Sequence, residues 1–173
     1  MAWKRLKEHF QIGHIVQIKE QTILIGSPYV SDLISVSADG ACAWGKLGAS
    51  TNPDLARYFA EMRSAPTLVR ELIASPDSFS AHNPVFTYEG GTVLEKKCEE
   101  YGWPNVTHDG LLMYENSFFR EKSKAIEKAK NNARAGIKSW TENIAEAEAA
   151  LAIKRAYLAE EIANLSRLDT DYP

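Results

Sequence analysis

The sequence predicts an α+β fold, in which a small antiparallel sheet with short helices is followed by a long, coiled-coil-like C-terminal amphipathic helix. Three observations support this prediction. Short β-favouring runs separated by turn residues fill residues 12–44. Apolar residues then recur at helical spacing over residues 51–75. From residue 121 to 168 there is no proline and only one glycine, and apolar residues keep a helical period throughout.

The first part of the chain predicts a β-meander. Residues 12–18 and 22–25 form two apolar runs across a polar break, which is typical of a hairpin. A third run covers residues 30–36. The turn residues 38–40 include Asp-Gly, which adopts positive φ at little cost, and residues 41–44 then form the returning strand.

Two short helices are predicted next. Asn52-Pro53 combines a capping residue with a proline at the first helical position, and helical spacing continues to Met62. Ala65-Pro66 interrupts this pattern, and apolar residues at helical spacing over residues 68–73 then predict a second short helix that is ended by Ser75-Pro76.

The following segment predicts a strand, a helix and a hairpin. Residues 85–88 favour a strand, and Gly90-Gly91 indicates a plain turn. Thr92 and Glu95 have the spacing of a capping box, which predicts a short helix over residues 93–101. The turn His108-Asp109-Gly110, between residues 106–107 and 111–114, predicts a hairpin.

These patterns divide the chain into an α+β domain (residues 1–119), a long helical segment (120–168) and a tail (169–173). One helix over the middle segment would be about 70 Å long, and one chain of this size cannot cover its apolar side. The segment either folds back as a hairpin near Asn131-Asn132 or Gly136, or pairs with a second copy. Because the apolar period runs through Gly136 unbroken, we predict a long helix and a homodimer.

The apolar side of this helix also fits a heptad repeat, with Lys154 and Glu161 as polar exceptions. We call its larger members the apolar stripe and predict that they form the dimer contact: Ile137, Trp140, Ile144, Leu151, Leu158, Ile162 and Leu165.

Charge is distributed unevenly along a chain whose net charge is −3. Residues 1–119 carry ten basic and fourteen acidic groups, residues 120–138 carry seven basic and two acidic groups, and residues 139–173 carry three basic and seven acidic groups. The near-neutral total therefore conceals a basic block between two acidic segments.

Five cations of the basic block fall on one side of a helix, opposite the apolar residues: Arg120, Lys124, Lys128, Arg134 and Lys138. This side is either a solvated surface, whose cations could also pair with the acidic half of an antiparallel partner, or a contact surface for phosphates or an acidic protein. No aromatic residues are interleaved with the cations, so an acidic protein partner is at least as well supported as nucleic acid.

Aromatic residues cluster around the hairpin before the long helix. They either form the core that joins hairpin, helix and sheet, or supply a binding hot spot based on Trp103 and Tyr114. We include both residues among the candidate partner-binding side chains.

Composition and motifs give little indication of catalysis. The chain is 45% hydrophobic, contains no apolar run long enough to span a membrane, and lacks the apolar core of a secretory signal near its N-terminus. Its two distant cysteines, Cys42 and Cys98, predict reduced thiols in a cytoplasmic protein. We find no GxSxG, phosphate-loop, dinucleotide-binding, HExxH or metal-binding motif, and expect no enzyme activity, catalytic residue, metal or cofactor.

An unrecognised enzyme remains an alternative. A cysteine could pair with one of the four histidines, of which His9 and His14 are expected in or beside the first strand. Glu99, Glu100 and Glu115 could supply carboxylates, although solvated charges of this kind are commoner.

Residues 110–120, GLLMYENSFFR, continue into KAIEKA at residues 124–129. This stretch resembles small accessory proteins of phages and prophages, in which a Tyr-Glu/Asp-Asn turn precedes an alanine-rich helical tail, and the resemblance covers residues 110–170. Some such proteins, including anti-CRISPR proteins, inhibit host defence by occupying a surface of their target. The resemblance implies a non-enzymatic, phage-encoded inhibitor that binds a host protein or nucleoprotein complex in the host cytoplasm. The main alternative is a dimeric nucleic-acid-binding regulator that uses the basic side of the long helix.

Overall fold

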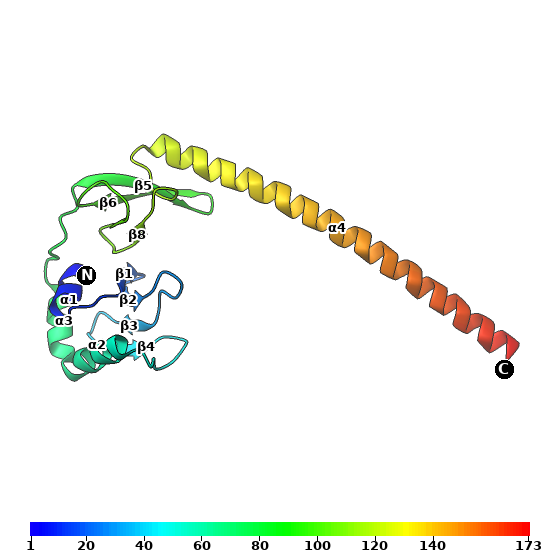
Figure 1. The fold of residues 1–173 in the computed structure, drawn as a ribbon, viewed down its shortest axis with the longest axis horizontal. Coiled ribbons are helices and arrows are strands. Elements are labelled where there is room, and N and C mark those ends of the chain that lie inside the picture. Colours follow the sequence, from blue (N-terminus) through cyan, green and yellow to red (C-terminus); the bar gives the residue numbers. More distant parts are fainter. The chain divides into compact units, whose positions relative to one another are not determined.

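The computed structural model describes all 173 residues and confirms the α+β class (Figure 1). It divides into two units, Met1–Ile126 and Glu127–Pro173. The elements are α1 (Trp3–His9), β1 (Ile15–Lys19), β2 (Thr22–Gly26), β3 (Ile34–Val36), β4 (Cys42–Trp44), α2 (Pro53–Ser64), α3 (Pro66–Ala74), β5 (Asn83–Glu89), β6 (Thr92–Cys98), β7 (Asn105–Val106), β8 (Leu112–Met113) and α4 (Lys122–Asp171).

The predicted meander is present as an antiparallel sheet in the order β1-β2-β3-β4. Alternate residues point to one face, where Val16, Ile25 and Ile34 lie in one cross-strand row and are almost completely buried. They form one core cluster with apolar residues of α1, α2 and α3. The sheet therefore buries one face beneath the three short helices. Strand β3 is shorter than expected because Ser27 and Val30 close a turn, in which the Ser27 N–H donates to the Val30 carbonyl oxygen at 2.8 Å.

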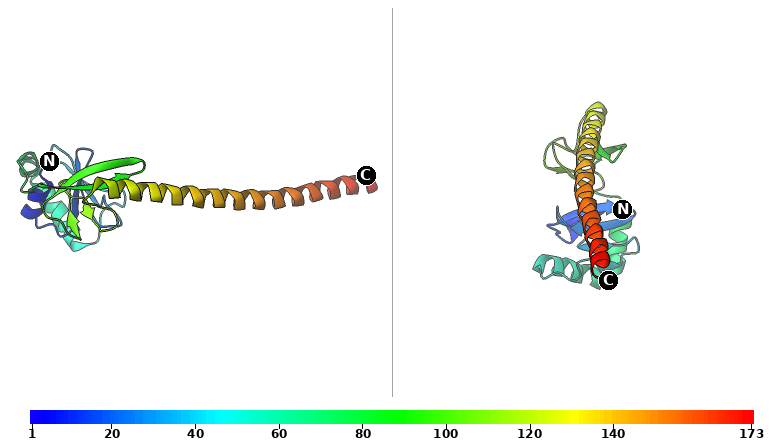
Figure 2. Two further views of the ribbon diagram at one scale, coloured as in Figure 1. Left: turned by 90° about the horizontal axis from the view of Figure 1, so that it is seen from above. Right: turned by 90° about the vertical axis from the view of Figure 1, so that its right-hand side faces the viewer.

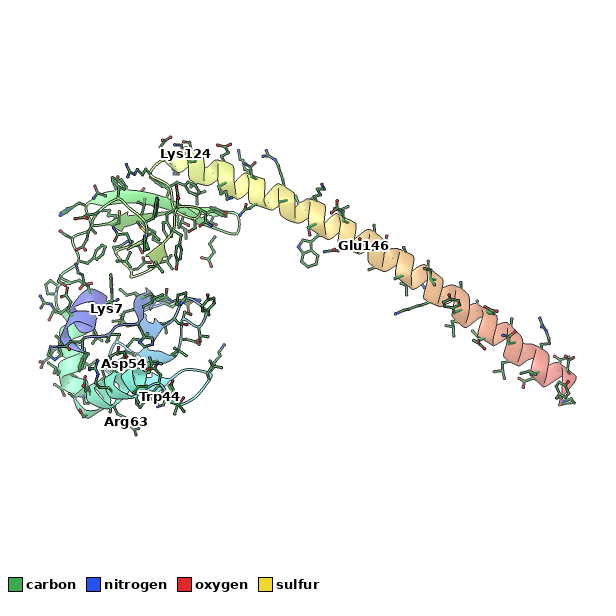
Figure 3. The ribbon with its side chains drawn as sticks, in the orientation of Figure 1. Lys7, Trp44, Asp54, Arg63, Lys124 and Glu146 are labelled. Atoms are coloured by element: carbon green, nitrogen blue, oxygen red, sulfur yellow. The ribbon has the colours of Figure 1, made fainter.

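Helix α2 begins at Pro53, where its capping residue and proline predict, and the second short helix is present as α3, which begins at Pro66, two residues before the predicted apolar pattern. The Asn52 side-chain oxygen accepts hydrogen bonds from the N–H groups of Asp54 (2.9 Å) and Leu55 (3.2 Å). Trp44, at the end of β4, stacks on Phe59 of α2 with 4.3 Å between ring centroids, and Figure 3 shows it beside this helix.

The N-terminal helix α1 is not among the predicted elements. Trp3, Leu6 and Phe10 recur at helical spacing and are buried in the main core, which is the signal that supports it. The Trp3 indole N–H donates to the His108 carbonyl oxygen at 2.8 Å. His9 lies in α1, so its expected position in or beside the first strand is wrong.

The helix predicted over residues 93–101 is also wrong, because residues 92–98 form strand β6. Seven residue pairs join β5 to β6 through the two-residue turn Gly90-Gly91. Gly90 has a φ of +54°, which is inexpensive for glycine. The capping-box spacing of Thr92 and Glu95 reflects only a local preference, whereas pairing with β5 satisfies the backbone groups of β6 that face the partner strand.

The second predicted hairpin is confirmed in shortened form as β7 and β8. The turn between them is attached to the outer edge of β1, where the Ile18 N–H donates to the Asp109 carbonyl oxygen at 2.7 Å. Gly110 has a φ of +78° and passes so close to Val16 that an added Cβ atom would lie 2.0 Å from the Val16 carbonyl oxygen. Glycine at position 110 is therefore favoured both by the positive φ of the turn and by this contact.

Helix α4 contains 50 residues. Figure 2 shows it as one uninterrupted helix, so the long-helix alternative is confirmed and the hairpin alternative is not. It continues to Asp171, into the segment expected as a tail. Its first turn belongs to the first unit, where Ala125 is fully buried, so this unit extends beyond the expected boundary at residue 119. No helix of the protein combines the length and apolar character needed to cross a membrane.

Candidate interaction surfaces

The apolar stripe is the largest exposed apolar feature of α4. Its seven side chains, from Ile137 to Leu165, are between 47% and 69% exposed, and Leu168 extends it at 56%. The unit 127–173 consists of this helix, so no other element of the unit covers the stripe. Exposed apolar surface of this extent is typical of contact sites, and heptad spacing is the pattern with which one helix packs against another.

The basic face of α4 lies on the side opposite the apolar stripe. Its helical members are Lys124, Lys128, Arg134 and Lys138, all exposed. Lys124 lies 3.0 Å from Glu121, and Lys138 lies 3.9 Å from Glu142, but both pairs are more than half exposed. Exposed ion pairs of this kind contribute little free energy, so Lys124 and Lys138 can leave these glutamates to contact another acidic group. Figure 3 marks Lys124 in the first turn of the helix.

Arg120 does not share this face, contrary to the prediction, because α4 begins only at Lys122. Its guanidinium lies 4.5 Å from the centroid of the Tyr101 ring. This is the geometry of a cation–π contact, which ties the segment before α4 to the loop that precedes β7.

Trp103 and Tyr114 flank the β7–β8 ladder. The register pairs Asn105 with Met113, so the residues just before β7 and just after β8 lie at the same end of the ladder. Their side chains are 38% and 45% exposed, which leaves a large part of each ring accessible. Tyr114 also lines a hollow of about 300 Å³, together with residues of β1, of the loop after β2 and of β8. The structure thus places both aromatics at the surface of the first unit, where a partner could contact them.

A charged cluster that the sequence does not predict lies in an adjoining hollow of about 350 Å³. The Lys96 ammonium donates to one oxygen of Asp109, and the Thr107 hydroxyl donates to the other. Burial alone would raise the pKa of Asp109, but the hydrogen bonds from Lys96 and Thr107 outweigh it and hold that pKa below its ordinary value. The ion pair between Lys96 and Asp109 joins two hairpins. Predicting it would require recognising residues 92–98 as a strand.

The two thiols lack the environment of a nucleophile. Burial raises the pKa of Cys42 to about 11. Burial also raises the pKa of Cys98, against a smaller opposing effect of Arg120. A reactive cysteine needs a lowered pKa, so neither thiol is activated at neutral pH.

Two of the remaining candidates for acid–base chemistry, Glu99 and His108, have partners that hold parts of the first unit together. Glu99 binds Lys4 at 2.8 Å and accepts from the Ser80 N–H at 2.8 Å, and these bonds lower its pKa. The His108 ring nitrogen Nδ1 accepts from the Lys97 N–H at 3.2 Å. No group of three or more histidine, cysteine, aspartate or glutamate side chains is arranged to hold a metal ion.

Comparison with protein-family models, with curated proteins and with solved structures finds no match to this chain. The surfaces described above are therefore interpreted from their own geometry and chemistry.

Proposed function

We propose that this protein acts by binding rather than by catalysis. In this proposal α4 is an assembly helix that pairs two chains, and the exposed surfaces of the first unit and of the basic face bind a target. The observation that carries the proposal is the apolar stripe, exposed along about eight helical turns. Apolar side chains that stay exposed to water contribute no burial free energy to an isolated helix, whereas a second helix would bury them.

The target proposed is a host protein or nucleoprotein complex, and the chain itself would act in the host cytoplasm as a phage-encoded inhibitor. The resemblance of residues 110–170 to phage accessory proteins, which include anti-CRISPR proteins, supports this assignment. The basic face supports an acidic binding surface on the target. Because this face and the apolar stripe lie on opposite sides of α4, one helix can use both at once.

Direct binding of nucleic acid by the basic face is the second candidate. It is favoured by the four exposed cations of the basic face, Lys124, Lys128, Arg134 and Lys138. Phosphate contacts would make affinity fall steeply with salt concentration, whereas an apolar protein contact would respond weakly. Titration of a duplex and of a single strand at two salt concentrations separates the two candidates.

The assembly part of the proposal is tested by replacing two residues of the apolar stripe, as Leu151→Glu with Leu158→Glu. Four buried carboxylates in the pair should abolish association, so light scattering should give a mass near 19.3 kDa where the wild type gives twice that value.

The matched control is Ala149→Glu with Ala156→Glu, which adds the same charge to the opposite side of the helix. This control should still associate. Equal masses for the two double variants would contradict assembly through the apolar stripe.

The target-binding part is tested by reversing three lysines of the basic face, Lys124, Lys128 and Lys138, to glutamate. We expect target capture by the tagged chain to fall at least about tenfold, because each reversal replaces an attraction with a repulsion.

A control with the same change in net charge carries Lys46→Glu, Arg63→Glu and Arg70→Glu, all exposed on the first unit. If both triple variants capture the target equally, the basic face is not the contact.

A further inference from the structure

We propose that α4 pairs with α4 of a second copy in antiparallel orientation, in a register that places Leu151 opposite Lys154 of the second copy. The inference rests on the proposed function, because it requires that the apolar stripe be covered by another chain. It adds the orientation and the register, which follow from the charges on and beside the stripe.

The heptad pattern of α4 has two core positions. The first is apolar through five heptads: Ile137, Ile144, Leu151, Leu158 and Leu165. The second is mixed: Trp140, Ala147, Lys154, Glu161 and Leu168. The two charged residues of the second position therefore decide which pairing is acceptable.

A parallel, in-register pair would place each core residue against its own copy. Lys154 would then face Lys154 and Glu161 would face Glu161, which puts two like-charge pairs into the contact. The basic segment 122–138 would also lie beside its own copy. Like charges that are partly removed from water repel strongly, so this arrangement is disfavoured.

An antiparallel pair instead places the first core position of one helix against the second position of the other. In the proposed register Lys154 faces Leu151 and Glu161 faces Ile144, so no charged core residue meets its own kind. Both long side chains can direct their charged ends to the rim of the contact. Trp140 faces Leu165. The small Ala147 faces the larger Leu158, so small and large side chains are matched across the contact.

The residues that flank the core select this register. Antiparallel pairing brings Glu148 beside Arg155 of the second copy, and Arg134 beside Asp169 of the second copy. The two-fold symmetry of a homodimer makes each of these pairs occur twice. A shift by one heptad in one direction places Glu148 beside itself, and a shift in the other direction places Arg155 beside itself. Only the proposed register pairs opposite charges at both positions.

Cysteine crosslinking tests the orientation. Ile137 is expected to face Leu168 of the second copy, so the double variant Ile137→Cys with Leu168→Cys should form a covalent dimer upon mild oxidation. Neither single variant should do so, since about 46 Å separates each site from its own copy at about 1.5 Å per residue. The wild type, with its half-buried Cys42 and buried Cys98, provides the background level.

Each result of this experiment has one interpretation. A covalent dimer from Ile137→Cys alone would show parallel pairing and overturn the inference while leaving assembly through α4 intact. A light-scattering dimer that none of the three variants crosslinks would overturn the register. A monomeric wild-type chain would overturn the proposed function as well.

Charge exchange tests the register independently. Glu148→Arg should weaken association about tenfold, because it turns two attractive pairs into two repulsive ones. The double variant Glu148→Arg with Arg155→Glu should restore association to within about twofold of the wild type. These two positions are seven residues apart in one helix and do not contact each other there.

The matched control is Glu146→Arg, on the side of α4 away from the stripe and marked in Figure 3. It should leave association unchanged. Failure of the double variant to recover association, or an equal loss in Glu146→Arg, would contradict the proposed register.

Discussion

At the level of single residues, Asp109 joins parts of the chain that are distant in sequence. Its carboxylate binds Lys96 of the neighbouring hairpin, and its carbonyl oxygen accepts from Ile18 of the first sheet. The two side chains of the ion pair are only about one-fifth exposed, at 20% and 19%. Removal of one partner would leave a poorly solvated charge, so this pair is worth more than an exposed one.

Asp109→Asn should therefore lower the free energy of unfolding by about 1–3 kcal/mol at pH 7. The pKa of Asp109 is depressed in the folded protein, whereas its unfolded value is about 3.9. The stabilisation is fully present above the unfolded pKa and is lost as pH falls through the folded pKa. Urea denaturation at pH 7 and at pH 3 should show the gap between wild type and variant closing at the lower pH.

The exposed carboxylate of Glu115 supplies the control for this comparison. Glu115→Gln should leave the free energy of unfolding nearly unchanged at both values of pH. A gap for Asp109→Asn that is independent of pH would contradict the role of its charge.

Gly110 gives a second test of the contact between the turn and β1. Gly110→Ala should cost at least about 2 kcal/mol, since the residue has positive φ and its Cβ would collide with the Val16 carbonyl oxygen. Gly48→Ala has a similar φ of +74° but no atom within 4 Å, so it should cost only about 1 kcal/mol. Equal losses in thermal denaturation would show that the backbone contact is unimportant.

At the level of single elements, the β1–β2 hairpin contains a turn whose residues are poorly suited to it. Glu20 and Gln21 have φ values of 48° and 64°, although neither is glycine or asparagine. A two-residue hairpin turn with two positive φ angles favours Asn-Gly. Replacement of Glu20 by Asn and Gln21 by Gly should raise the free energy of unfolding by about 0.5–1 kcal/mol in urea denaturation. A loss of stability would contradict this interpretation.

The elements differ in how well the sequence predicts them. The meander, α2, α3 and α4 follow from patterns that local chemistry and tertiary packing both favour, such as the Asn52-Pro53 start of α2. The helix predicted over residues 93–101 is wrong because the capping-box spacing at Thr92 is a local signal, whereas pairing with strand β5 depends on residues outside that short segment. The prediction that Arg120 lies on the helix is wrong because periodicity alone does not define the first residue of a helix.

At the level of the whole molecule, the candidate surfaces are of two kinds. The apolar stripe and most of the basic face could be predicted, because one helical period fixes which residues share a side of α4. The hollow at Lys96 and Asp109 could not, because it depends on how two hairpins pack against the first sheet. Sequence periodicity predicts which residues share a side of a helix, but it does not predict which residues far apart in the chain come into contact.

Association and the structure of α4 should be coupled. An unpaired helix outside a folded core is marginally stable, so most of its stability would come from the second helix. The variant Leu151→Glu with Leu158→Glu should therefore lose helical circular dichroism at 222 nm as well as mass. Unchanged ellipticity in a monomeric variant would show that α4 does not depend on a partner for its structure.

Sedimentation equilibrium of the wild-type chain at several concentrations is the most direct measurement of assembly through α4. Between about 1 and 100 µM the mass should rise towards, and level off at, twice 19.3 kDa, as expected for a reversible dimer. A mass that stays at 19.3 kDa throughout this range would contradict assembly through α4.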